Sequence, residues 1–96
     1  MADNLSSGLY LVCTPIGNRG DITLRTLEIL KECDILISED TRVAKKLLSM
    51  YSIPLRGRHL LSYKDKSTHV ARQKIIEFIK ANNSVVLMSD AGSPLI

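Results

Sequence analysis

Four short runs of apolar residues alternate along the chain with three longer segments in which apolar positions recur at helical spacing. The short runs cover residues 9–14, 34–38, 59–63 and 84–89. Continuous apolar runs of this length are typical of strands buried on both faces of a parallel sheet, and we expect this of residues 9–14 in particular. Between the runs, apolar residues three or four positions apart predict helices over residues 22–32, 41–51 and 67–82.

Residues suited to helix capping support these boundaries. Asp21 or Thr23 is expected to cap the first helix, and Asp40 or Thr41 the second, because short polar side chains accept hydrogen bonds from the unpaired N–H groups of a first turn. Asn82 is suited to a left-handed C-cap at the end of the third helix. The order is therefore strand, helix, strand, helix, strand, helix, strand.

Strands that alternate with helices indicate parallel pairing through right-handed crossovers, and hence an α/β fold. The carboxyl ends of all four strands then lie along one edge of the sheet, where open α/β sheets bind ligands. The segments expected at that edge are residues 14–17, 38–40, 62–63 and 89–92. A dinucleotide site of the usual kind is excluded, because only Gly17 and Gly20 follow the first strand, and no phosphate-binding P-loop motif is present.

Composition indicates one small soluble domain. The 96 residues are 45% hydrophobic and 24% charged, with one Phe and no Trp, so the core must be aliphatic. No signal peptide or membrane-spanning run is visible, which favours a cytoplasmic protein without a membrane partner. Cys13 and Cys33 lie among apolar neighbours and are expected to be small buried hydrophobes, and His59 and His69 lack the partners of a metal site.

Charge is unevenly distributed along the chain. Residues 42–74 contain nine Lys or Arg and one acidic residue, a balance of +8, whereas the rest of the chain has four basic and nine acidic residues, a balance of −5. The asymmetry has two interpretations: a positive flank that faces a polyanion such as RNA, or ordinary solvated helix faces.

Two polar turns supply candidate chemistry at the expected ligand edge. Asp40 is interpreted first as a helix cap, whereas Glu39 is free to point into the cleft. Arg42 either neutralises Glu39 or contacts an anionic substrate. In the last turn, Gly92 provides a positive φ or a close approach to a ligand, and Asp90 caps the turn or receives a polar group of that ligand.

The motifs "TPIGNRGDITLR" (residues 14–25), "EDTR" (39–42) and "SDAGSP" (89–94), in this order and spacing, resemble the tetrapyrrole methylase superfamily and most closely its RNA-modifying branch. The resemblance spans Leu9 to Pro94. It implies a two-domain enzyme that uses S-adenosylmethionine, with residues 1–96 as the N-terminal three-layer αβα domain and the C-terminal domain absent from this chain. That domain has a five-stranded parallel sheet, of which the chain holds four strands.

The resemblance also assigns roles to residues. It places the cofactor at the first-strand loop and the last turn, which comprise Pro15, Gly17, Ser89, Asp90, Ala91, Gly92, Ser93 and Pro94. It does not assign the catalytic base: the candidates are the acids expected at the ligand edge, Glu39, Asp40 and Asp90, or a group of the absent domain, and no metal is expected. The candidates for contact with RNA are Arg42, Lys45, Lys46, Tyr63 and Lys64.

The resemblance implies 2'-O-methylation of a cytidine in small-subunit ribosomal RNA, with the RNA or the small ribosomal subunit as partner. Two alternatives remain open: methylation of a corrin or porphyrin, and a catalytically silent domain that binds RNA or another copy of itself. Because the second domain is missing, we expect the 96-residue chain alone to be inactive and its last strand to be partly exposed. Exposed apolar edges also favour a homodimer or higher self-association.

Overall fold

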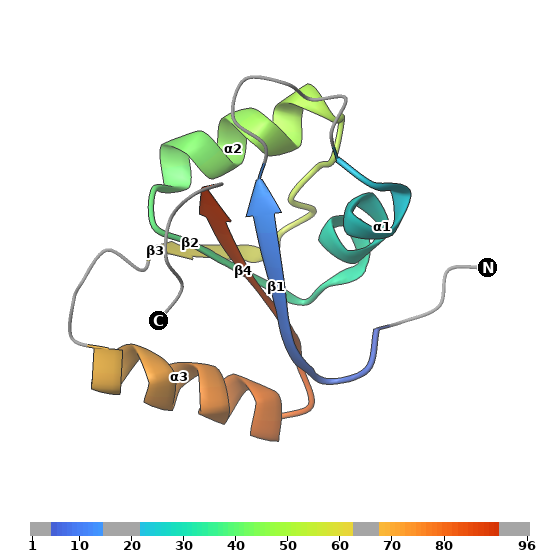
Figure 1. Cartoon of the computed structure of the whole chain (residues 1–96). Coiled ribbons are helices and arrows are strands. Elements are labelled where there is room, and N and C mark those ends of the chain that lie inside the picture. Colours follow the sequence, from blue (N-terminus) through green and yellow to red (C-terminus); the bar gives the residue numbers. More distant parts are fainter. Residues whose placement is uncertain (1–4, 15–21, 63–67, 91–96) are drawn as a thin grey trace.

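The structure is a computed structural model that describes residues 5–14, 22–62 and 68–90, and for residues 14, 68–71 and 90 only the backbone. Its elements follow in the order β1 (Gly8–Thr14), α1 (Leu24–Glu32), β2 (Ile35–Ser38), α2 (Thr41–Met50), β3 (His59–Ser62), α3 (Thr68–Lys80) and β4 (Ser84–Asp90) (Figure 1). All seven predicted elements are present, and their observed ends lie close to the predicted ones. None of the described helices is long and apolar enough to cross a membrane.

The four strands form one parallel sheet in the order β1-β4-β2-β3, which confirms the predicted α/β class. The register aligns the strand ends: Thr14 lies opposite Asp90. Ser38 lies opposite Met88 on one side and Ser62 on the other. The four carboxyl ends therefore share one edge of the sheet, as predicted.

Helices cover both faces of the sheet and complete three layers. Helices α1 and α2 lie on one face and α3 on the other (Figure 1). Alternate strand residues point to opposite faces, so Leu36 and Val86 pack with α1 and α2, whereas Ile35 and Val85 pack with Ile75 of α3. The β2 run 35–38 is buried throughout because it lies inside the sheet between two helical layers.

The helix ends follow the predicted capping. The Thr23 hydroxyl accepts a hydrogen bond from the backbone N–H of Thr26 at 3.1 Å, and the Asp40 carboxylate accepts one from the backbone N–H of Arg42 at 3.0 Å. Asn82 has a φ of 71°, the left-handed conformation expected after α3. Thus Thr23 and Asp40 are the caps among the alternatives that the sequence left open.

Strand β1 differs from the prediction, because it is an edge strand and only one of its sides is covered. Val12 is buried, but Leu9 and Leu11 on the other side are 44% and 56% exposed, and Cys13 is exposed with them. The prediction that β1 is buried on both faces is therefore wrong, as is the prediction that Cys13 is buried, whereas Cys33 is buried as expected.

The last strand is not the exposed one. Strand β4 lies between β1 and β2, and its Val85 and Val86 are fully buried. The prediction of an exposed last strand is wrong because the crossover through α3 returns the chain to the middle of the sheet. The open apolar surface belongs to the first strand instead.

Candidate functional site

The carboxyl ends of β2 and β4 and the first turns of α2 enclose a small niche at the ligand edge of the sheet. Its lining residues combine hydroxyl, carboxylate and apolar groups: Ser38, Glu39, Asp40, Val43, Leu47, Met88 and Ser89. The niche measures about 10 Å³, which is room for about one water molecule. A ligand larger than water must therefore lie above this niche.

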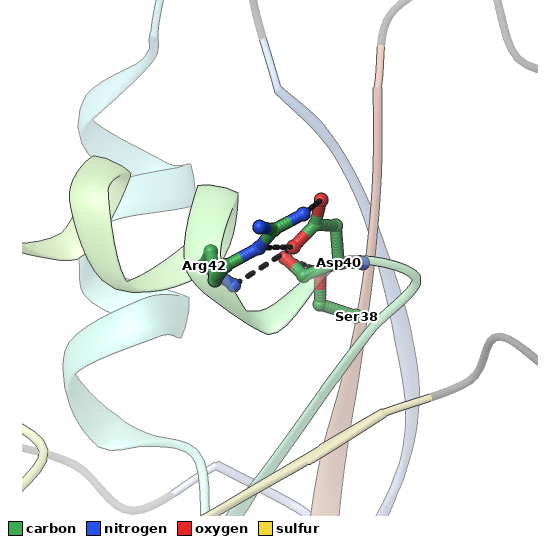
Figure 2. A network of polar contacts seen from close by, with 3 residues as sticks. All are labelled: Ser38, Asp40 and Arg42. Atoms are coloured by element: carbon green, nitrogen blue, oxygen red, sulfur yellow. Dashed lines mark hydrogen bonds and ion pairs between the residues drawn. The ribbon is translucent and has the colours of Figure 1, made fainter.

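Asp40 is the centre of a local polar network at the start of α2 (Figure 2). Its carboxylate accepts hydrogen bonds from the backbone N–H of Arg42 at 3.0 Å and from the Arg42 guanidinium at 3.3 and 3.4 Å. The Ser38 hydroxyl accepts a hydrogen bond from the backbone N–H of Asp40 at 3.2 Å and donates one to the Asp40 carbonyl at 3.1 Å. The turn from strand to helix is thereby held by side chains from both of its ends.

These contacts define the chemical state of Asp40. The hydrogen bonds from the Arg42 side chain and backbone hold the pKa of the Asp40 carboxyl below its usual value. Asp40 therefore stays ionised at neutral pH and its oxygens are occupied, which weakens it as a proton acceptor. Arg42 pairs with this cap and not with Glu39, because its guanidinium reaches back two residues to the carboxylate.

Glu39 has the opposite environment. It is exposed at the rim of the niche, and its carboxylate makes no hydrogen bond or ion pair within the described part of the chain. Val43, which is 45% exposed, supplies apolar surface beside it. A free carboxylate on a partly apolar rim is available to accept a proton or to bind a cationic or hydroxyl group of a ligand.

The other predicted site residues divide into two groups. Lys45 and Lys46 lie exposed on α2, Ser89 is buried at the niche, and Asp90 ends β4 opposite Thr14. The remaining candidates lie outside the described residues, namely Pro15, Gly17, Tyr63, Lys64, Ala91, Gly92, Ser93 and Pro94. Their assignment to cofactor or RNA binding stays a prediction. Among the described residues, no group of His, Cys, Asp or Glu is arranged to hold a metal ion.

The basic segment 42–74 does not form one positive flank. Lys45 and Lys46 lie on α2, whereas Arg72 and Lys74 belong to α3, on the opposite face of the sheet (Figure 1). Arg58 is occupied by backbone carbonyl groups, as its hydrogen bonds to Leu30, Cys33, Pro54 and Leu55 show. Within the described part of this segment, the unpaired lysines on the site's side of the sheet are therefore Lys45 and Lys46 of α2.

Sequence reasoning missed the apolar part of the niche. Val43 and Leu47 belong to the apolar spacing that predicts the helix over residues 41–51, and nothing in the sequence indicated that both also line the niche. Their spacing of four residues places them on one face of α2, and this face passes over the end of β2. The spacing is visible in the sequence, but the strand order is needed to see that this face of the helix borders the niche.

Three helices on two faces of a parallel sheet define the class: a three-layer α/β domain, with a capped turn and a free carboxylate at the carboxyl edge as its candidate ligand site. Residues 8–96 match the sequence pattern of the family described as Tetrapyrrole (Corrin/Porphyrin) Methylases. The chain therefore belongs to this family, and the resemblance seen in its motifs is confirmed.

Several relatives share a single description, "Ribosomal RNA small subunit methyltransferase I". The protein from Rickettsia prowazekii is 52% identical over 92 residues, which cover 96% of this chain and 32% of the relative. The protein from Mesorhizobium japonicum is 47% identical over 92 residues, covering 96% and 30%, and that from Bacillus subtilis is 44% identical over 88 residues, covering 92% and 29%. The chain thus spans less than a third of the length of these curated relatives.

Proposed function

We propose that this domain is the N-terminal part of an S-adenosylmethionine-dependent methyltransferase that modifies a ribose 2'-hydroxyl of a cytidine in small-subunit ribosomal RNA. The observation that carries the proposal is the 52% identity, over nearly the whole chain, to a relative described as a ribosomal RNA small subunit methyltransferase. The free surface lysines on α2, on the same side of the sheet as the niche, support an RNA substrate.

The described residues fit part of a site for S-adenosylmethionine. The niche is too small to hold the cofactor, so the cofactor would lie over the edge, with Val43 offering an apolar contact. When bound, S-adenosylmethionine supplies an electrophilic methyl group. The loops at residues 15–17 and 91–94 remain the predicted further contacts.

A ribose hydroxyl is a poor nucleophile and needs a group that accepts its proton. Of the three candidate carboxylates, Asp40 is occupied by the helix end and by Arg42, and the side chain of Asp90 lies outside the described part of the chain. Glu39 is the one that lies at the rim of the niche and whose carboxylate has no partner among the described residues. We therefore assign the proton-accepting role to Glu39, with the strand-to-helix turn as its rigid support.

The test uses protein expressed from the complete reading frame, labelled S-adenosylmethionine and small ribosomal subunits. The unaltered protein is expected to transfer the label to a ribose of the small-subunit RNA. Glu39→Gln should lower kcat by about 10²- to 10⁴-fold, the usual contribution of a positioned base. Glu77→Gln is the matched control, because Glu77 is an exposed carboxylate on α3, on the opposite face of the sheet.

The outcomes separate the competing functions. Label transfer to a corrin or porphyrin and none to RNA would replace the proposed substrate by a tetrapyrrole, and the absence of transfer to either would favour a silent docking domain. A Glu39→Gln protein with unchanged kcat would remove Glu39 from the mechanism but leave the substrate assignment intact.

A further inference from the structure

A second depression lies along the C-terminal half of α2 and the turn that follows it. It is open to solvent, measures about 480 Å³ and is lined by Lys45, Leu48, Ser49, Ser52, Ile53, Pro54 and Leu55. This volume is within the range of small-molecule sites. Both hollows are lined in part by α2: Val43 and Leu47 line the niche, whereas Lys45, Leu48 and Ser49 line the depression, so the two lie on different faces of this helix.

The backbone of this depression is firmly held. The turn after α2 closes with a hydrogen bond from the Ile53 N–H to the Leu48 carbonyl at 2.8 Å, with Ser52 in the left-handed conformation at a φ of 58°. The opposite rim is fixed by Arg58, whose guanidinium donates to the Pro54 and Leu55 carbonyls at 2.8 Å each. The depression is thus formed before any ligand arrives.

The residues that line the depression combine an apolar floor, two hydroxyl groups and one positive charge. Leu48 and Ile53 are buried and give an apolar floor, Pro54 and Leu55 add apolar rim, and the hydroxyl-bearing Ser49 and Ser52 are exposed. Lys45 contributes one positive charge, and none of the seven lining residues is acidic. An unstacked nucleotide has the matching parts: a base face for the apolar floor, polar base edges for the hydroxyls and a phosphate for the ammonium.

The surface of α2 that leads to the depression is also positively charged. Arg42, Lys45 and Ser49 follow at intervals of three and four residues and therefore lie on one exposed face of α2, which runs from the start of the helix to the depression. Because Arg42 is paired with Asp40, Lys45 carries the unpaired charge of this face. Lys46 lies beside this face. A single strand whose target ribose is at the niche would pass these groups and reach the depression a few nucleotides away.

We propose that the depression at the C-terminal end of α2 binds an unstacked nucleotide of the RNA substrate, a few positions from the methylated one. This inference rests on the proposed function. It adds a second RNA contact that positions the strand and contributes to recognition without taking part in the chemistry.

The first test is kinetic and uses protein from the complete reading frame with small ribosomal subunits. Lys45→Gln should raise the KM for subunits roughly five- to tenfold, leave kcat unchanged and reduce the salt dependence of binding by about one counterion. Lys74→Gln removes the same charge from α3, on the opposite face of the sheet, and should leave KM unchanged. Equal effects of the two substitutions would overturn the inference, because they would report net charge alone.

The second test identifies the occupant directly. Ser49→p-benzoylphenylalanine places a photoreactive group at the depression, on an exposed helix position that tolerates a larger side chain. Irradiation with subunits should give an adduct to RNA within a few nucleotides of the methylated ribose. An adduct to a ribosomal protein, or none, overturns the inference. If the unaltered protein transfers no methyl group, the proposed function is wrong. If it transfers the methyl group normally but forms no RNA adduct, only the inference about the depression is wrong.

Discussion

Arg58 connects the loop after α2 to the end of α1, and its removal should be among the most destabilising single changes outside the core. Its Nη1 group donates to the Leu30 carbonyl at 2.7 Å and to the Cys33 carbonyl at 3.1 Å. Its Nε and Nη2 groups donate to Leu55 and Pro54 at 2.8 Å each. One side chain thus satisfies four carbonyl groups from two segments.

The size of the effect follows from these contacts. A hydrogen bond from a charged group contributes about 1.5–3 kcal/mol, but water can reach the carbonyls on the loop side once Arg58 is gone, and contributions to one side chain are not additive. We therefore expect Arg58→Ala to lower the free energy of unfolding by about 2–4 kcal/mol. Arg58→Lys should recover less than half, because an ammonium group cannot reproduce the planar fork of donors.

Urea unfolding of the 96-residue chain, followed by circular dichroism, measures this difference. Arg56→Ala is the matched control, because Arg56 is exposed and its guanidinium contacts one carbonyl of the same helix end, that of Lys31. We expect the Arg56 substitution to cost at most about 1 kcal/mol. If Arg58→Ala cost no more than Arg56→Ala, the argument that this guanidinium organises the loop would be refuted.

Two further predictions concern ionisation. Because the folded-state pKa of Asp40 is lowered, its ionised form stabilises the fold above the unfolded pKa of about 3.9, and this stabilisation is lost as the pH falls through the lowered folded value. The stability advantage over Asp40→Asn, measured by urea unfolding, should therefore be present at pH 7 and vanish in acid; an advantage that persists in acid would contradict the pairing with Arg42. Burial raises the pKa of the Cys33 thiol to about 11, whereas Cys13 is exposed. A thiol reagent at pH 8 should therefore modify one cysteine quickly in the folded 96-residue chain, and Cys13→Ser should abolish this fast phase; two fast thiols would contradict the burial of Cys33.

Local features were predictable from the sequence because their causes are local. The caps at Thr23 and Asp40 depend on side chains that hydrogen-bond two or three residues away, and the alternation of apolar runs with helical spacing determines the α/β class. The convergence of polar strand ends followed from parallel pairing alone. The position of Glu39 at the niche was predictable for the same reason.

Long-range features were not predictable, because nothing in a short apolar run records its neighbours. The sequence "LYLVCT" reads the same for a central strand and for an edge strand, so the exposure of Leu11 and Cys13 required the strand order. Arg58 appeared only as part of a basic segment, because its partners are carbonyl groups whose positions depend on how α1 meets the following loop. The second depression was not predictable either, because α2 and the loop after it form it together.

The strand order also determines what the open side of β1 means for stability. From β1 through β2 to β3 the chain advances across the sheet with α1 and α2 on one face, and the step back to β4 places α3 on the other. A fifth parallel strand beyond β1 would continue that backward direction, so a right-handed crossover would run over Leu9 and Leu11. Leu11→Ser would then behave as a surface change in the 96-residue chain and as a core defect in a chain that carries the fifth strand. The same substitution would thus report whether the first strand has become part of a closed core.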